Sequence, residues 1–237
     1  SFAYQGKEVL HDITVTLPKN SLTALVGPSG SGKSTVMKLC ARFYDPQKGR
    51  ILFNGVPMNE INPESLMSHI SMVFQDVYLF QDTIRNNIRF GKTDATEEEI
   101  IAAAKKACCH DFIMRLPKGY DTLVGEGGCT LSGGEKQRIS IARAMLKDAQ
   151  IILLDEATAS LDPENEVEVQ KAIDALIKGH TVIAIAHRLK TIKGADQIIV
   201  LDNGQIKEKG THETLMQAEG LYAQLWNIQE QISGWKL

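Results

Sequence analysis

One stretch of the chain decides the fold, and it reads Leu22-Thr23-Ala24-Leu25-Val26-Gly27-Pro28-Ser29-Gly30-Ser31-Gly32-Lys33-Ser34-Thr35. Its first five residues predict a buried strand, and the three glycines that follow allow backbone N–H groups to converge on one point. The next residues, Val36 to Leu39, favour a helix whose positive N-terminal end faces the same point. The spacing is G-x-x-x-x-G-K-S/T, so we expect a loop that cradles phosphate groups.

The residues of this loop have distinct expected roles. We expect Lys33 to hold the β- and γ-phosphates of a nucleoside triphosphate and the Ser34 hydroxyl to ligate Mg²⁺. The expected nucleotide contacts are Gly27, Pro28, Ser29, Gly30, Ser31, Gly32, Lys33, Ser34 and Thr35. The sequence therefore predicts a site for a nucleoside triphosphate with Mg²⁺.

The composition narrows the class of protein. The chain has 237 residues, a net charge of −3 and 43% hydrophobic residues, which is typical of a globular protein with a substantial core. The slightly negative net charge argues against a wide surface that binds nucleic acid, so we expect no nucleic-acid partner. No apolar run approaches the roughly 18 residues of a membrane-spanning helix.

The cysteines predict neither a metal site nor a disulfide framework. They are Cys40, Cys108, Cys109 and Cys129. Their spacing includes no C-x-x-C pair, so we expect free thiols in a reducing compartment.

The order of expected elements is typical of an α/β fold. We expect strands at 9–17, 22–26, 49–53, 70–74, 151–154 and 181–186, hairpin turns at 54–55 and 202–204, and helices from the phosphate loop to about 44, from about 132 and at 163–178. Between Gln75 and about Leu131 the composition is helical, and Thr96 and Glu99 form a capping-box pattern. Strand, helix and strand in the last third indicate a parallel sheet.

A buried strand that ends in two carboxylates supplies further chemistry. Ile151 to Leu154 is apolar, and Asp155 and Glu156 follow it at the sheet edge where ligands of open α/β sheets bind. Neighbouring residues of a strand point in different directions, so Asp155 can hold Mg²⁺ while Glu156 faces the attacking water as a general base. The sequence therefore predicts nucleotide hydrolysis.

A second glycine-containing motif stands ahead of that strand, and it reads Leu131-Ser132-Gly133-Gly134-Glu135. Ser132 can cap the following helix, and the glycines allow close approach to a phosphate. The phosphate loop, this motif and the acidic strand follow one another along the chain. In this order they resemble the motifs of the ATP-binding cassette family, and the pentapeptide resembles the signature motif of that family. The resemblance implies that Ser132, Gly133, Gly134 and Glu135 contact ATP held by another subunit, with ATP between two copies.

Four further residues match motifs of this family. Tyr4 resembles the aromatic residue that stacks on adenine, although a tyrosine at a strand end can also be a core residue. Gln75 resembles the glutamine that reaches Mg²⁺ and water, and His187 resembles the switch histidine that hydrogen-bonds the γ-phosphate. Asp162 resembles a residue of the loop that contacts the opposite subunit, and helix capping is its alternative role. The resemblance thus gives Lys33, Gln75, Glu156 and His187 catalytic roles, and it assigns Mg²⁺ to Ser34, Gln75 and Asp155.

Two stretches resemble exporter-type cassettes in particular: Asp82 to Ile88, and Thr122 to Gly128, in which Glu126 is expected to transmit motion. The fold implied is a P-loop NTPase core with a mostly parallel sheet, an antiparallel β edge region and an inserted α-helical subdomain. Residues 1–237 would form one nucleotide-binding domain, with the helical subdomain at about 76–131 and the remainder a RecA-like core with a β subdomain. The chain starts at Ser1 within a strand, so we expect it to be cut from a longer protein.

The partners implied are a second nucleotide-binding domain, in a homodimer or heterodimer, and the coupling helices of a transmembrane domain that this chain lacks. The resemblance places the domain at the cytoplasmic face of a membrane. Three alternatives stay open from the sequence: a cassette ATPase that acts on ribosomes or nucleic acid, an importer ATPase subunit, and a cassette that binds ATP without hydrolysing it.

Overall fold

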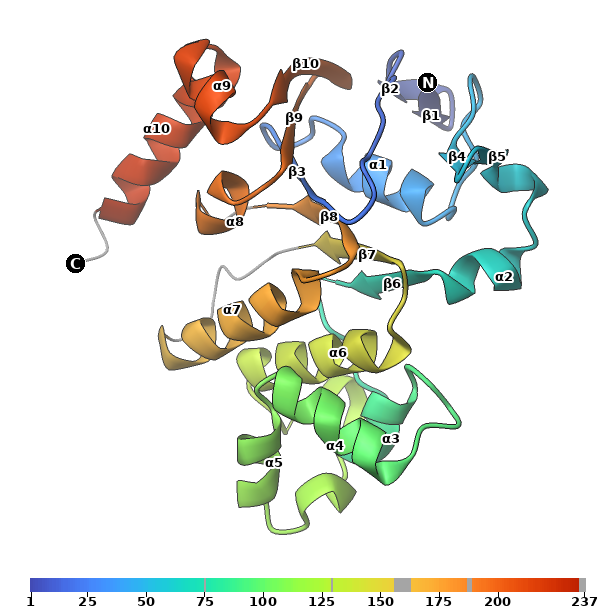
Figure 1. The fold of residues 1–237 in the computed structure, drawn as a ribbon, viewed down its shortest axis with the longest axis vertical. Helices are drawn as coiled ribbons and strands as arrows, with labels where there is room; N and C mark the ends of the chain where they lie inside the picture. Colours follow the sequence, from blue (N-terminus) through green and yellow to red (C-terminus); the bar gives the residue numbers. More distant parts are fainter. Residues whose placement is uncertain (75, 129, 156–162, 187–188, 235–237) are drawn as a thin grey trace. The chain divides into compact units, whose positions relative to one another are not determined.

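The computed structural model describes residues 1–74, 76–128, 130–155, 163–186 and 189–234 (Figure 1). The chain divides into two compact units. One comprises residues 1–70, 153–156 and 181–237, and the other comprises 71–152 and 157–180. The phosphate loop belongs to the first unit and the signature motif to the second.

A six-stranded sheet forms the centre of the fold, in the order β10-β9-β3-β8-β7-β6 (Figure 1). Its strands are β3 (Leu22–Val26), β6 (Ile70–Val73), β7 (Ile151–Asp155), β8 (Thr181–Ile185), β9 (Gln197–Asp202) and β10 (Gln205–Gly210). Strand β3 pairs in parallel with both β8 and β9, while β10 runs antiparallel to β9. All five residues of β3 are buried, which explains its continuous apolar sequence. The expected α/β fold with a mostly parallel sheet is confirmed.

Two small antiparallel pairs and a hairpin lie outside the parallel strands. Strands β1 (Phe2–Tyr4) and β2 (Lys7–Leu10) pair with each other, as do β4 (Leu52–Phe53) and β5 (Val56–Pro57). The predicted turns are both present. Asn54 and Gly55 have φ of 50° and 84°, and Asn203 and Gly204 have 47° and 72°. These positive values suit two-residue hairpin loops, which explains the Asn-Gly sequence at each turn.

Three expected boundaries are wrong. The strand expected at 49–53 comprises only β4, Leu52–Phe53, and Gly49 before it takes a left-handed φ of +82°. The strand expected at 9–17 ends at Leu10, because Asp12 takes a φ of +46° and bends the chain. After Leu10, the side chains of Ile13, Val15 and Leu17 are half-buried and those between them are exposed. The predicted alternation of burial is therefore present, although residues 13–17 are not part of a strand. Helix α1 (Lys33–Cys40) ends four residues earlier than predicted, because Arg42 adopts a left-handed φ of +54°.

The helices of the first unit lie around the phosphate loop, β4, β5 and the C-terminal hairpin. Besides α1 they are the short helix η1 (Met58–Glu60), α2 (Pro63–Ser68), α8 (Leu189–Lys193), α9 (His212–Gln217) and α10 (Leu221–Gly234). Helix α10 packs against α8, α9 and β10. The Glu208 carboxylate fixes its start by accepting hydrogen bonds from the N–H groups of Leu221 at 2.5 Å and Tyr222 at 3.0 Å.

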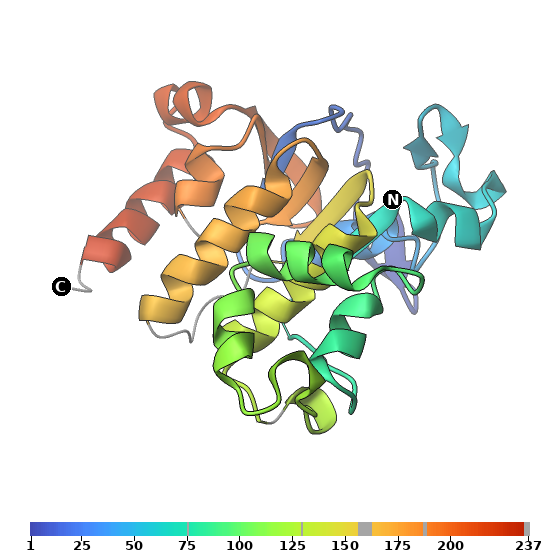
Figure 2. The same cartoon turned by 60° about the horizontal axis from the view of Figure 1, so that its bottom comes forward.

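The second unit is mainly helical. Its helices are α3 (Ile84–Arg89), α4 (Glu97–Lys106), α5 (His110–Arg115), η2 (Gly119–Asp121), η3 (Glu126–Gly128), α6 (Gly133–Lys147) and α7 (Pro163–Ile177). The predicted capping box of Thr96 and Glu99 is present at the start of α4. Helix α6 packs against α3, α4 and α7 and is therefore the central helix of this unit (Figure 2).

The cysteines that the structure describes, Cys40, Cys108 and Cys109, are free thiols, as expected. In the described ranges, every helix is too short or too polar to cross a lipid bilayer.

Candidate nucleotide-binding site

The phosphate loop connects β3 to α1, and its geometry leaves donors available for an anion. The N-cap residue of α1 is Gly32, with a φ of 103°, and no side chain caps the helix. The first turn contains no acidic residue. Because the first N–H groups of a helix have no partners within it, an uncapped start without carboxylates favours a bound anion.

The loop is held in place by the β9–β10 hairpin. A Cβ atom on Gly27 would overlap the carbonyl oxygen of Leu201 in β9, so only glycine allows this approach. The N–H group of Gly204, at the hairpin turn, donates to the Ser31 carbonyl oxygen at 3.2 Å. The Gly204 carbonyl oxygen in turn accepts from the His11 N–H group at 2.8 Å. This support was not predicted, because it joins residues more than 170 positions apart and no local pattern signals it.

Lys33 folds back over its own loop. Its Nζ atom donates to the carbonyl oxygens of Gly27 at 2.8 Å and Pro28 at 2.7 Å. Burial of the ammonium lowers the pKa of Lys33, while the negative charge of Asp155 acts in the opposite direction. The carboxylate of Asp155, the last residue of β7, is therefore near enough to act on the ammonium of Lys33.

The residues present fit a nucleoside triphosphate with Mg²⁺. The uncapped helix start and Lys33 supply donors for phosphate oxygens, and Ser34 and Asp155 supply the oxygen ligands that Mg²⁺ prefers. The described part of the chain contains no cluster of three or more His, Cys, Asp or Glu side chains that could enclose a metal ion. Mg²⁺ usually takes one or two carboxylates and fills its other positions with water and substrate phosphates.

Tyr4 lies in an aromatic cluster beside α1. Its ring meets those of Phe2 and Tyr44 edge to face, at centroid distances of 4.8 and 5.3 Å. Its ring also packs on the core cluster of Phe2, Leu10 and Leu39, which Val36 of α1 joins as well. Its hydroxyl is buried and has no hydrogen-bond partner among the described residues. This position suits both readings of Tyr4, as a base-stacking residue and as a core residue.

The signature motif begins α6 with a complete capping box. The Ser132 hydroxyl accepts from the Glu135 N–H group at 3.3 Å, and the Glu135 carboxylate accepts from the Ser132 N–H group at 2.8 Å. The box does not use the N–H groups of Gly133 and Gly134, the first two residues of the helix. Ser132 and Gly133 are exposed, whereas Gly134 is buried. The motif thus has an exposed helix start. The carboxylate of Glu135 caps this helix by accepting the hydrogen bond from Ser132.

Four predicted site residues lie outside the described residues: Gln75, Glu156, Asp162 and His187. Their assignments remain predictions.

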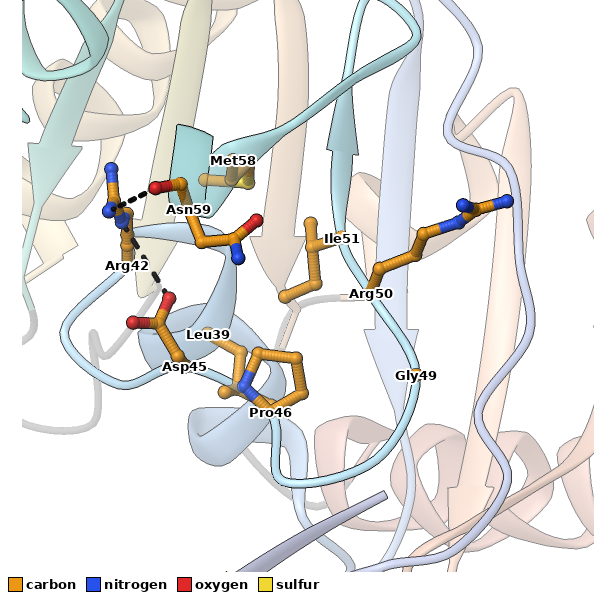
Figure 3. A pocket seen from close by; sticks show the side chains of 9 residues that line it. All are labelled: Leu39, Arg42, Asp45, Pro46, Gly49, Arg50, Ile51, Met58 and Asn59. Atoms are coloured by element: carbon orange, nitrogen blue, oxygen red, sulfur yellow. Dashed lines mark hydrogen bonds and ion pairs between the residues drawn. The ribbon is translucent and has the colours of Figure 1, made fainter. Parts of the chain in front are cut away.

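One hollow of about 110 Å³ lies at the C-terminal end of α1, and its lining includes none of the residues predicted to bind nucleotide (Figure 3). Arg42 lines it and donates to the carbonyl oxygens of Ile61 at 2.7 Å and Asn59 at 3.2 Å, and its Nε lies 3.6 Å from an Asp45 oxygen. Because these contacts already satisfy the guanidinium of Arg42, we interpret the hollow as part of the packing between α1 and the β4–β5 hairpin.

The family model described as ABC transporter matches residues 10–159, which include the phosphate loop, the signature motif and Asp155. The chain belongs to the ABC transporter family. Membership confirms the P-loop ATPase fold and the prediction that the domain binds ATP and hydrolyses it.

Named relatives place the chain among exporter-type ABC transporters. It is 52% identical over 229 residues to an ATP-dependent lipid A-core flippase of Syntrophus aciditrophicus, covering 97% of this chain and 38% of the flippase. It is 50% identical over 231 residues to a putative multidrug export ATP-binding/permease protein of Bacillus subtilis, covering 97% and 40%. The solved structure of a bacterial Atm1-family ABC exporter with ATP bound aligns with a TM-score of 0.90 and 47% identity, covering 96% and 40%.

These ABC transporters favour the exporter reading over a nucleic-acid cassette or an importer subunit. The chain spans about two fifths of the length of each of them.

Proposed function

We propose that this ATPase domain powers export of a substrate across a membrane as part of a longer transporter. The observation that carries the proposal is the uncapped start of α1 with Lys33, whose ammonium is affected by the negative charge of Asp155 at the end of β7. The exporter relatives support the direction of transport.

In this proposal each residue has a defined task. The start of α1 and Lys33 bind and orient the phosphates, so that the γ-phosphate is held in line for attack. Glu156 accepts a proton from the attacking water, and His187 donates a hydrogen bond to the γ-phosphate oxygens. Gln75 helps to orient the water, and Ser34, Gln75 and Asp155 hold Mg²⁺. When bound, Mg²⁺ neutralises charge that develops on the phosphate oxygens.

A complete site needs two domains. We propose that ATP on one phosphate loop contacts the exposed signature residues Ser132 and Gly133 of a second nucleotide-binding domain, head to tail, with Gly134, Glu135 and Asp162 completing that surface. Two N–H groups left unused by the capping box support this role. Hydrolysis would remove the γ-phosphate that joins the two domains and so allow them to part. The partner is an identical copy or a related chain.

The second unit supports a further contact, with the coupling helices of a transmembrane domain. The two exporter-like stretches lie side by side in it: the Val124 N–H group donates to the Asp82 carbonyl oxygen at 3.0 Å, and Ile84 donates to Thr122 at 3.0 Å. This unit also exposes large apolar side chains, with Tyr78 55%, Phe90 61% and Leu123 64% exposed. We assign the helical subdomain to about 76–131 and the transmembrane contact to this surface. The domain would then lie at the cytoplasmic face, where ATP is supplied.

The test uses a Glu156→Gln variant, which should bind Mg-ATP while turnover is nearly abolished. Size-exclusion chromatography with light scattering should show a dimer with Mg-ATP and a monomer without it. Adding Ser132→Arg should abolish the dimer while ATP binding persists, because the arginine obstructs the signature surface. A dimer that survives Ser132→Arg would contradict the head-to-tail arrangement, and undiminished turnover in Glu156→Gln would exclude Glu156 as the base.

A further inference from the structure

Arg138 occupies an unusual position in α6. It lies six residues after Ser132 and is only 7% exposed, although it carries a charge. Its Nη1 atom donates to the Cys108 carbonyl oxygen at 3.0 Å and its Nη2 atom donates to Oδ1 of Asn165 at 2.8 Å. The guanidinium also lies over the Phe112 ring, 4.9 Å from its centre. One side chain thus joins α6 to the α4–α5 junction, to α5 and to α7.

Asn165 makes a second contact with the same helix. It stands in the first turn of α7, and a Cβ atom on Gly134 would lie 2.6 Å from the Cβ atom of Asn165. The glycine of the signature motif therefore allows Asn165 to lie directly against the start of α6. From there Asn165 accepts the hydrogen bond from Arg138, so that the beginnings of the two helices are held together at two points.

Stability alone does not account for a guanidinium at this position. The Nε atom of Arg138 is buried without a hydrogen-bond partner in the described part of the chain, and an unpaired buried donor costs free energy. The carboxylate of Glu168 lies near enough to feel the charge of Arg138, but it is itself paired with Lys171 at 2.8 Å. Buried ionic groups of this kind are often replaced by apolar residues without loss of stability, whereas they do fix a particular arrangement of elements.

We infer that Arg138 is a positioning residue for the signature motif, and that it acts by clamping the start of α6 to Asn165 at the start of α7. This rests on the proposed function, in which Gly133 and Gly134 present their N–H groups to the ATP of a second domain. The clamp fixes the direction in which these N–H groups point. The planar guanidinium reaches two acceptors on different elements at once, which a lysine ammonium on its flexible stem does not reproduce.

The experiment measures two binding events separately in a Glu156→Gln background. Titration calorimetry with Mg-ATP at low protein concentration measures binding to the phosphate loop of one domain. Sedimentation analysis with saturating Mg-ATP measures the dissociation constant of the dimer. The variants are Asn165→Ala, which removes the acceptor, Asn165→Asp, which keeps it, and Arg138→Lys. Val167→Ala is the matched control, because it truncates an exposed side chain of the same helix that the clamp does not use.

Asn165→Ala and Arg138→Lys should each weaken the dimer by about tenfold or more, while the ATP affinity of the single domain changes less than about twofold. Asn165→Asp and Val167→Ala should dimerise like the parent. The clamp is overturned if Asn165→Ala dimerises like the parent, or if Asn165→Ala and Asn165→Asp lose dimerisation equally. It is also overturned if ATP affinity of the single domain falls in parallel with dimerisation, since that result indicates a general structural role. If the parent itself does not dimerise with Mg-ATP, the proposed two-domain site fails, and the clamp fails with it.

Discussion

The Nζ atom of Lys33 donates a hydrogen bond to the carbonyl oxygen of Gly27, 2.8 Å away and six residues earlier in the chain. The loop thereby closes on the ammonium group that is expected to hold phosphate. A phosphate oxygen that enters the loop offers a charged acceptor in place of neutral carbonyls, and hydrogen bonds to charged groups are the stronger ones. The exchange of acceptors favours phosphate binding.

Replacing this ammonium should therefore remove most of the nucleotide affinity. Lys33→Met keeps the aliphatic stem and loses the charge, so Mg-ATP affinity should fall by about 30-fold or more, which corresponds to about 2 kcal/mol. Titration calorimetry measures the change. Lys38→Met is the control, because Lys38 is exposed on the same helix and should bind ATP like the parent. Equal affinities of Lys33→Met and parent would remove Lys33 from the site.

Tyr4 can be tested as a base-stacking residue with two ligands. Tyr4→Ala should weaken ATP binding by about tenfold, in the range of aromatic–base stacking, and leave the affinity for inorganic tripolyphosphate unchanged. Tyr4→Phe should keep both affinities, because the stacking face remains. If Tyr4→Ala binds ATP as the parent does, Tyr4 is a core residue only. If both ligands weaken together, the substitution has disturbed the loop through the cluster with Phe2 and Tyr44.

The close approach of Gly27 to β9 predicts an unequal effect of alanine at two glycines of the loop. Gly27→Ala should lower the free energy of unfolding by about 3 kcal/mol, from backbone strain at a φ of 151° together with overlap with the Leu201 carbonyl oxygen. Gly30→Ala should cost about 1 kcal/mol, since its φ is 76° but nothing lies within 4 Å of the added atom. Urea unfolding without nucleotide makes the comparison, and equal losses would refute the contact with β9.

Cys109 should make stability depend on alkaline pH. Burial raises the pKa of its thiol from 9.0 to about 12, so the thiol stays protonated in the folded chain where it ionises in the unfolded chain. A raised folded-state pKa contributes stability that is complete below pH 9 and is lost as pH rises toward 12. The free energy of unfolding should therefore fall between pH 9 and 10.5 by about 1 to 2 kcal/mol more in the parent than in Cys109→Ala. Urea unfolding at these values tests this, and matching slopes would contradict the buried thiol.

Much of the fold could be predicted because local chemistry determines it. The strand at 22–26 is buried along its whole length, and the Asn-Gly turns at 54 and 203 need left-handed backbone that these residues adopt readily. The capping boxes at Thr96 and Ser132 also form as their spacing indicates. The failures have local causes too, since single left-handed residues, Asp12 and Arg42, end regular structure that periodicity would extend. The short helices α2, α8 and α9 were missed, because five or six residues give too little periodicity.

For the site, sequence spacing named candidate residues, whose roles stay predictions, and it did not indicate what supports them. The expectation that Lys33 and Asp155 act together came from their places after buried strands of one sheet, and the charge of Asp155 does act on Lys33. The hydrogen bond from Gly204 to Ser31 and that from Arg138 to Asn165 join distant segments through tertiary packing. Such contacts form only when the chain has folded, so the residue types at these positions do not predict them.

The support of the phosphate loop by the C-terminal hairpin sets an order on biosynthesis. Leu201 and Gly204, which hold the loop at 27–35, leave the ribosome some 170 residues after it. At typical translation rates of about 5–20 residues per second, the nascent loop waits on the order of ten seconds or more for its support. A growing chain therefore completes its phosphate loop only after the β9–β10 hairpin has been made, so that nucleotide capture has to wait for that hairpin.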